Sequence, residues 1–68
     1  MKFSNDIEKL KSLILEKEHI ENILVCTGNS YHVVSGCVID FDEDYIFNFE
    51  GFSFHLEIDE IKSFILIE

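Results

Sequence analysis

From His19 onward the chain consists of short runs of β-branched and aromatic residues that alternate with polar ones. Groups of turn-forming residues separate these runs, and the chain has no proline that would forbid strand pairing. Such a pattern favours a series of short antiparallel strands joined by tight turns. The predicted strands are 20–27, 31–41, 44–50, 52–58 and 62–67.

The first part of the chain has a helical period instead. Its apolar residues fall on one stripe: Phe3, Ile7, Leu10, Leu13 and Ile14. Asn5 followed by Glu8 fits a capping box, so we predict a helix over about 5–18 and a β-rich body over about 20–67. The predicted class is therefore α+β, in one domain covering 1–68. We expect the five-stranded, strongly bent antiparallel sheet to close as a small SH3-like barrel, which removes exposed edges.

The last run of the chain is apolar on both faces of its predicted strand. It consists of Phe64, Ile65, Leu66 and Ile67. We expect this strand to be covered twice, once by the core and once by the helix or by another subunit. Because 68 residues are close to the length at which one core barely offsets chain entropy, self-association through this strand would help the fold. The strand is our candidate oligomer interface.

Charge is distributed unevenly along the chain. Between residues 19 and 61 there is no lysine or arginine, although the whole chain has a net charge of −9. The same stretch contains nine acidic residues: Glu21, Asp40, Asp42, Glu43, Asp44, Glu50, Glu57, Asp59 and Glu60. Nucleic acids bind mainly through neutralisation of their phosphates by basic side chains, so direct binding of DNA or RNA is not expected. The partner should be basic, or indifferent to charge.

Two cysteines bear on the compartment. A hairpin turning near 28–30 would place Cys26 opposite Tyr31 and Cys37 near Ile20 or Glu21. That register separates the thiols by about five residue steps of ~3.4 Å each, which is too far for a disulfide. We expect two buried free thiols. No apolar run approaches the ~20 residues of a membrane span, and no signal peptide is recognisable, so a cytoplasmic protein is expected.

Residues 23–61 resemble the Sm-like family, which includes the bacterial RNA chaperone Hfq. The spacing of the first Sm motif is held by Gly36, Val38, Phe41 and Asp42, and residues 54–61 resemble the second motif. The resemblance implies an N-terminal helix, a small barrel and edge-to-edge oligomerisation, with Gly36 where the barrel strand bends. The RNA-binding positions are not retained: Ile46 stands in place of a base-holding asparagine, and His55-Leu56 in place of a lysine-histidine pair.

Two alternating sets of side chains are candidate metal ligands. Asp40, Asp42 and Asp44 match the opening of an EF-hand loop, but Tyr45 and Gly51 stand where that loop needs a glycine and a bidentate glutamate. The second set is His55, Glu57 and Asp59. A single strand would space these three ~7 Å apart, which is too wide for a compact site. Solvated acidic segments are the alternative in both cases, and neither a metal nor a cofactor is expected.

Enzymatic chemistry is not expected either. No serine lies in a nucleophile elbow, no Cys-His signature occurs, and residues 19–61 lack the lysine or arginine that would hold an oxyanion or a phosphate. A chain of 68 residues also leaves little room for a pocket of ~300 Å³.

The acidic residues gather at two predicted turns and form two candidate partner-binding ridges, with Tyr45 between them as an aromatic contact. The first ridge is Asp40, Asp42, Glu43 and Asp44, and the second is Glu57, Asp59 and Glu60. One hypothesis is an inhibitor or regulator that mimics nucleic-acid charge and occupies a basic protein groove, as small phage-encoded inhibitors of bacterial defence do. The alternative is an Sm-like adaptor that oligomerises through residues 62–67, in which the charge serves only solubility.

Overall fold

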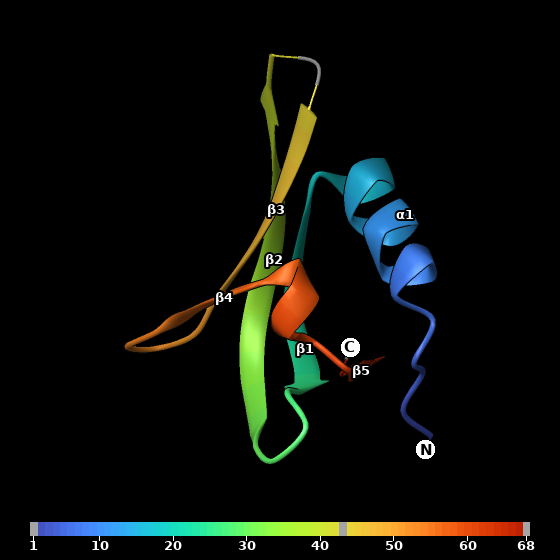
Figure 1. Ribbon diagram of the computed structural model, residues 1–68, viewed down its shortest axis with the longest axis vertical. Coiled ribbons are helices and arrows are strands. Elements are labelled where there is room, and N and C mark those ends of the chain that lie inside the picture. The colour runs from blue at the N-terminus through green and yellow to red at the C-terminus, as the bar shows by residue number, and fades with distance from the viewer. Residues whose placement is uncertain (1, 43, 68) are drawn as a thin grey trace.

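The computed structural model describes residues 2–42 and 44–67 and confirms the α+β class (Figure 1). One α-helix precedes five strands, and a short 3-10 helix lies between the last two strands. The elements are α1 (Ile7–Lys17), β1 (His19–Cys26), β2 (Tyr31–Phe41), β3 (Asp44–Glu50), β4 (His55–Glu57), η1 (Ile58–Glu60) and β5 (Ser63–Leu66).

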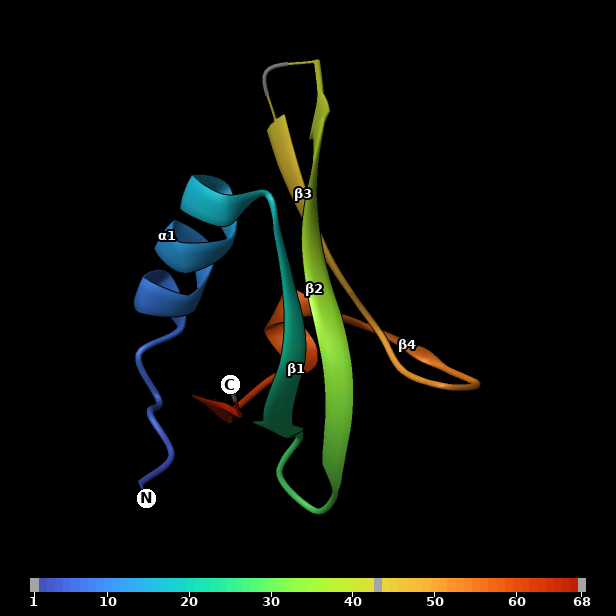
Figure 2. The same cartoon turned by 180° about the vertical axis from the view of Figure 1, so that it is seen from behind.

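The strands form a single antiparallel sheet in the order β4-β3-β2-β1-β5. The helix packs on one side of this sheet, as two opposite views show (Figures 1 and 2). Within the residues that the structure describes, β4 and β5 are the two edges of the sheet and do not pair with each other. The sheet is therefore open, and the predicted closure into a barrel is not observed. With only three residues, β4 offers little backbone for closing it.

The predicted capping box of Asn5 and Glu8 is wrong by one residue. Asp6 is the N-cap, because its carboxylate accepts a hydrogen bond of 3.1 Å from the backbone N–H of Lys9. At the other end Glu18 adopts a left-handed conformation (φ 65°) and donates its N–H to the carbonyl of Ile14. The helix thus ends sharply, and the chain enters β1 at the next residue.

The core lies between α1 and the sheet. Its fully or almost fully buried side chains are Leu10, Ile14, Ile20, Ile23, Val25, Val34, Phe49, Ile61 and Phe64. Gly36 lies in the sheet directly against Phe49 and against Ile14 of α1. A Cβ there would lie 2.8 Å from Cε1 of Phe49 and 3.2 Å from Cδ1 of Ile14. The absence of a side chain at Gly36 therefore lets the helix and Phe49 pack against the sheet.

A β-bulge shifts the register of the first hairpin. Ile20 pairs with Gly36 and Ile23 with Val34, so two residues of β1 stand opposite one of β2. Asn22 has a positive φ of 57° within the bulge. Cys26 lies opposite Tyr31 as predicted, whereas Cys37 lies opposite His19.

Both cysteines are free thiols, but they are half-buried and not buried as expected.

The fourth strand is much shorter than the predicted 52–58. The Gly51 N–H donates to the Phe54 carbonyl (2.9 Å) and closes a loop, in which a Cβ at Gly51 would collide with the Phe54 ring. Phe52 is fully exposed in this loop. After Glu57 the chain turns into η1, so strand pairing ends after three residues.

The candidate oligomer strand is only partly covered. Phe64 is buried in the core, Ile65 and Leu66 are half-buried, and Ile67 is exposed. The outer edge of β5 is in contact with the N-terminal segment: Ser4 and Phe64 exchange two backbone hydrogen bonds of 2.8 and 2.9 Å. The N-terminal segment thus occupies part of this edge, which is not the expected cover by the helix or by another subunit, and Ile67 is exposed.

Candidate protein-binding surface

One end of the β2–β3 hairpin extends past the end of α1 (Figure 1). We call this end the arm and define it as residues 38–42 and 44–47. The arm is a regular antiparallel ladder in which Val38 pairs with Phe47 and Ile39 with Ile46. Directly opposed residues share a face of the sheet, so Ile39 and Ile46 lie on one face together, and Val38 and Phe47 on the other.

Large apolar side chains are exposed on both faces of the arm. Ile39 and Ile46 are 48% and 45% exposed on the face away from the helix, and Tyr45 is 55% exposed on the other. Exposure of three such side chains in one short hairpin end is not required by the core, which lies elsewhere. Clustered apolar surface of this kind marks interaction sites on small proteins.

Carboxylates lie at the end of the arm, beyond these apolar side chains. Asp42 and Asp44 are exposed at the end of the arm, where Asp42 has a positive φ of 48°. Of the other predicted site residues of the first ridge, Glu43 lies outside the described residues, and so does the side chain of Asp40. The arm thus has exposed apolar side chains along its strands and exposed carboxylates at its end.

The second predicted ridge lies elsewhere in the fold. Glu57, Asp59 and Glu60 are exposed on β4 and η1, and Glu57 pairs with Asn48 in the second half of β3. Tyr45, at the start of β3, therefore lies beside the first ridge and not between the two. A carboxylate oxygen of Glu60 accepts a hydrogen bond of 2.7 Å from the backbone N–H of Glu57, so this side chain has a structural role that the sequence pattern did not indicate.

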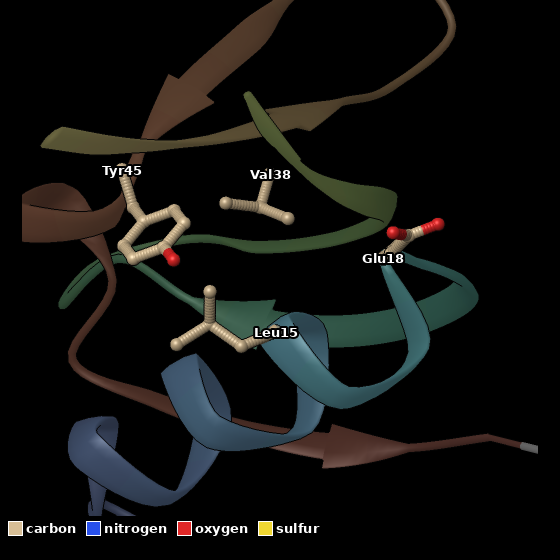
Figure 3. A pocket seen from close by; sticks show the side chains of 4 residues that line it. All are labelled: Leu15, Glu18, Val38 and Tyr45. Atoms are coloured by element: carbon tan, nitrogen blue, oxygen red, sulfur yellow. The ribbon is translucent and has the colours of Figure 1, made fainter. Parts of the chain in front are cut away.

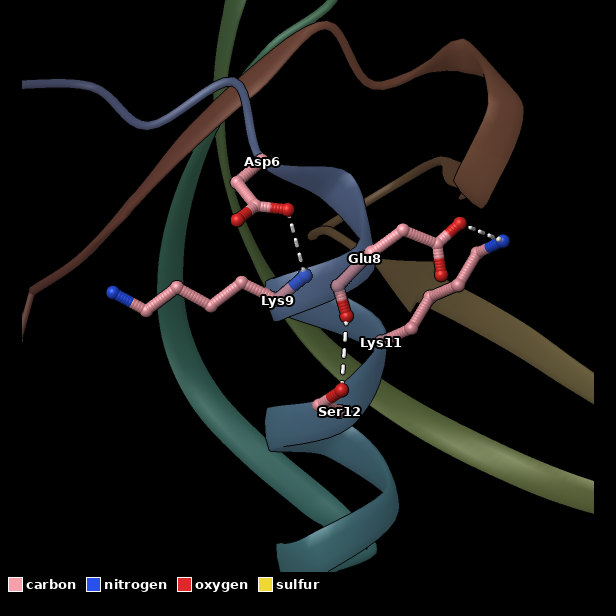
Figure 4. Close-up of polar contacts among 5 residues, drawn as sticks. All are labelled: Asp6, Glu8, Lys9, Lys11 and Ser12. Carbon is pink, nitrogen blue, oxygen red and sulfur yellow. Dashed lines mark hydrogen bonds and ion pairs between the residues drawn. The ribbon is translucent and has the colours of Figure 1, made fainter.

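Ion pairing does not neutralise those carboxylates of the two ridges that the structure describes. In the part of the chain that the structure describes, one ion pair is formed, between Lys11 Nζ and Glu8 Oε1 at 3.5 Å on α1 (Figure 4). The described carboxylates of the arm, β4 and η1 have no such partner and remain exposed to solvent. They are available to a basic partner without loss of an existing ion pair.

A hollow of about 580 Å³ lies between the end of α1 and the arm. It is lined by Leu15 and Glu18 from the helix side and by Val38 and Tyr45 from the arm (Figure 3). Its volume exceeds the ~300 Å³ for which so small a chain was expected to leave little room. The sequence singled out Tyr45, but it gave no signal for Leu15 or Glu18, because their contribution depends on where the helix ends.

Aromatic side chains of the β3–β4 loop and the first hairpin lie on another part of the surface. The ring of Phe54 packs on His32 with centroids 4.7 Å apart, while Phe52 makes no aromatic contact among the described residues. Phe3 packs on Tyr31 at 5.6 Å. These contacts account for Phe54 and Tyr31 as packing partners and leave Phe52 as a free aromatic at a loop end.

Among the side chains that the structure describes, no three of His, Cys, Asp or Glu come close enough together to hold a metal ion, and His55, Glu57 and Asp59 do not form such a group. No described helix has the length and apolar character needed to cross a bilayer.

Comparison of the chain with protein families, with curated proteins and with solved structures finds no match. The function has to be inferred from the chain's own geometry and charge.

Proposed function

We propose that the protein is a non-enzymatic binding module whose arm docks on a basic, partly apolar protein surface. One observation carries the proposal: Ile39, Ile46 and Tyr45 are about half exposed on the arm, next to the exposed carboxylates of Asp42 and Asp44. Apolar anchors supply most of the binding energy of an interface, while surrounding charges select the partner and speed its approach.

The charge favours a partner that ordinarily handles nucleic acid. A net charge of −9 with no lysine or arginine between 19 and 61 presents to such a protein the sign of charge that its groove is built to bind. An inhibitor or regulator of the phage anti-defence type would work in this way. Its place would be the cytoplasm, where the free thiols of Cys26 and Cys37 stay reduced.

The proposal is tested by capture of partners from lysate on the immobilised protein at low and at high salt. We expect a basic nucleic-acid-handling protein to be retained at low salt and released at high salt, because screening weakens contacts between exposed charges. Added DNA or RNA should compete for that partner and should not itself bind the immobilised protein.

A matched pair of variants separates the arm from charge in general. The arm variant Asp44→Asn with Ile46→Ser removes one charge and one exposed apolar side chain. The control, Glu21→Gln with Val33→Ser, removes one charge and one exposed apolar side chain from the body, where both residues are also exposed. Retention should be lost with the arm variant only. Equal retention by both variants would reduce the acidic surface to a solubility device.

The open sheet supports the Sm-like adaptor as a second candidate. Because β4 and β5 are unpaired with each other, the barrel expected from the sequence could be completed between copies, with β5 of one chain beside an edge of the next. The contact of Ser4 with Phe64 would have to open, since it occupies part of the β5 edge. Sedimentation at low and high salt tests this candidate, which requires a large species at both, whereas the binding module should remain monomeric or dimeric.

A further inference from the structure

We propose that the hollow between α1 and the arm receives an arginine side chain of the basic partner. This inference rests on the proposed function and assigns a defined contact within it. The hollow has about 580 Å³ of space, and its lining combines two aliphatic side chains, one phenol ring and one carboxylate. An aliphatic stem that ends in a planar cation has the chemistry that matches such a lining.

The side chains of the hollow form an apolar path that leads to one carboxylate. Figure 3 shows the Tyr45 ring at one side of the gap and Glu18 at the other, with Leu15 and Val38 between them. Leu15 is 40% exposed and Tyr45 55% exposed, so both still have apolar surface to cover. The three methylenes of an arginine would lie on that surface.

Arginine fits this site better than lysine does. A guanidinium is planar and binds a carboxylate through two parallel hydrogen bonds. Glu18 supplies that carboxylate at one side of the gap, while the Tyr45 ring lies at the other side and lines the path of the aliphatic stem. An ammonium group, which is more strongly hydrated and not planar, would pair with the carboxylate less well.

The position of the site is fixed by the fold. The carbonyl of Glu18 accepts a hydrogen bond of 3.3 Å from the Val38 N–H, which ties the end of the helix to β2 at the hollow. Lys11, one helical turn before Leu15, has its ammonium group 3.5 Å from Glu8, so that cation is paired outside the hollow. Asp44, adjacent to Tyr45 in β3, adds negative charge nearby.

The test is an NMR titration of the full chain with N-acetylarginine amide, with N-acetylcitrulline amide as its neutral, nearly isosteric control. We expect the arginine derivative to shift the resonances of Leu15, Val38 and Tyr45 to saturation at millimolar concentration. Citrulline should bind at least about tenfold more weakly, because it lacks the charge that pairs with Glu18.

Two variants with equal changes of charge sharpen the test. Glu18→Gln should weaken arginine binding about tenfold, whereas Glu16→Gln, exposed on the same helix but not part of the hollow, should leave it within about twofold. Tyr45→Leu keeps an apolar side chain but removes the ring, so it should also weaken arginine binding. This variant takes the place of Glu18→Gln in the test if Glu18→Gln fails to fold. Equal binding of citrulline, equal losses for Glu16 and Glu18, or shifts spread over all acidic residues would overturn the proposal.

Failure of the arginine-binding proposal can be distinguished from failure of the proposed function. The capture experiment depends on Asp44 and Ile46, neither of which lines the hollow. A partner that is captured by the arm although arginine does not bind the hollow would refute this inference alone. Arginine binding without any captured basic partner would refute the proposed function alone.

Discussion

The two ends of strand β2 put apolar side chains to different uses. In the body, Val34 is buried beneath the helix, and Phe49 on the neighbouring strand is completely inaccessible to solvent. In the arm, Ile39 on the same strand is 48% exposed, and its partner Ile46 is 45% exposed. Burial of apolar surface stabilises the body, whereas the arm leaves comparable surface in water. The arm's apolar side chains therefore contribute less to folding than those of the body, which is the basis of our proposal that they serve recognition.

The largest effect should come from truncation of equivalent aromatics in the two regions. Phe49→Ala should lower the free energy of unfolding by about 3–5 kcal/mol, since it empties a fully buried site. Tyr45→Ala, in the exposed arm, should cost about 1 kcal/mol or less. Urea unfolding of both variants measures the contrast, and equal losses would show that the arm is part of the stabilising core.

A smaller effect is expected from filling the space at Gly36. Gly36→Val should destabilise the body by about 1–3 kcal/mol, because the new Cβ would meet the Phe49 ring and the Cδ1 of Ile14. Ile39→Val in the arm, also a change to valine on β2, should cost less than about 1 kcal/mol at its exposed site. An unchanged melting temperature for Gly36→Val would contradict the close packing of helix and sheet.

Within the second acidic ridge, the carboxylate of Glu60 stabilises the fold through a hydrogen bond, whereas the carboxylate of Asp59 makes no such bond among the described residues. Glu60→Ala should cost about 1 kcal/mol, because it removes the acceptor for the Glu57 N–H at the start of η1. Glu60→Gln keeps an acceptor oxygen and should cost less, and Asp59→Asn should be close to neutral. Thermal unfolding of the three variants checks the order, which would be wrong if Asp59→Asn cost as much as Glu60→Ala.

The smallest effect on stability is expected at the end of the arm. Asp42→Asn and Asp44→Asn should each change the free energy of unfolding by no more than about 0.5 kcal/mol, since both are exposed and asparagine tolerates the positive φ of Asp42. Their combined loss should nevertheless slow association with the captured partner and flatten its salt dependence. Stopped-flow or surface-based kinetics measure this, and unchanged association rates would separate the acids from binding.

The sequence predicted the elements better than it predicted their closure. The alternation around Gly51 and the turn at residues 28–30 correctly indicated antiparallel hairpins, and helical spacing indicated α1. The sequence predicts a strand over 52–54 because Phe52 and Phe54 alternate with the polar Ser53. In the structure, the Gly51 N–H donates to the Phe54 carbonyl and closes a loop instead. The length of β4, and with it the open edge, depends on that local hydrogen bond and on η1, which periodicity does not encode.

The candidate site was predicted in part. Turn position and composition correctly indicated that Tyr45, Asp42 and Asp44 are exposed. The same reasoning placed Tyr45 between the two ridges, whereas it lies beside the first ridge on the arm and the second ridge lies on β4 and η1. Linear alternation carries no information on how far a strand extends past the helix. The helical pattern gives no sign of a role for Glu18, because its contribution to the hollow follows from its left-handed cap conformation, which ends α1 beside Val38.

The central claim is that the arm binds the partner and the edges of the sheet do not. Hydrogen–deuterium exchange of the full chain, with and without the captured partner, tests it most directly. We predict that binding slows exchange in residues 38–42 and 44–47 and leaves 55–57 and 63–66 unchanged. Slower exchange confined to those two edge segments, with the arm unchanged, would contradict the account and favour assembly through strand edges.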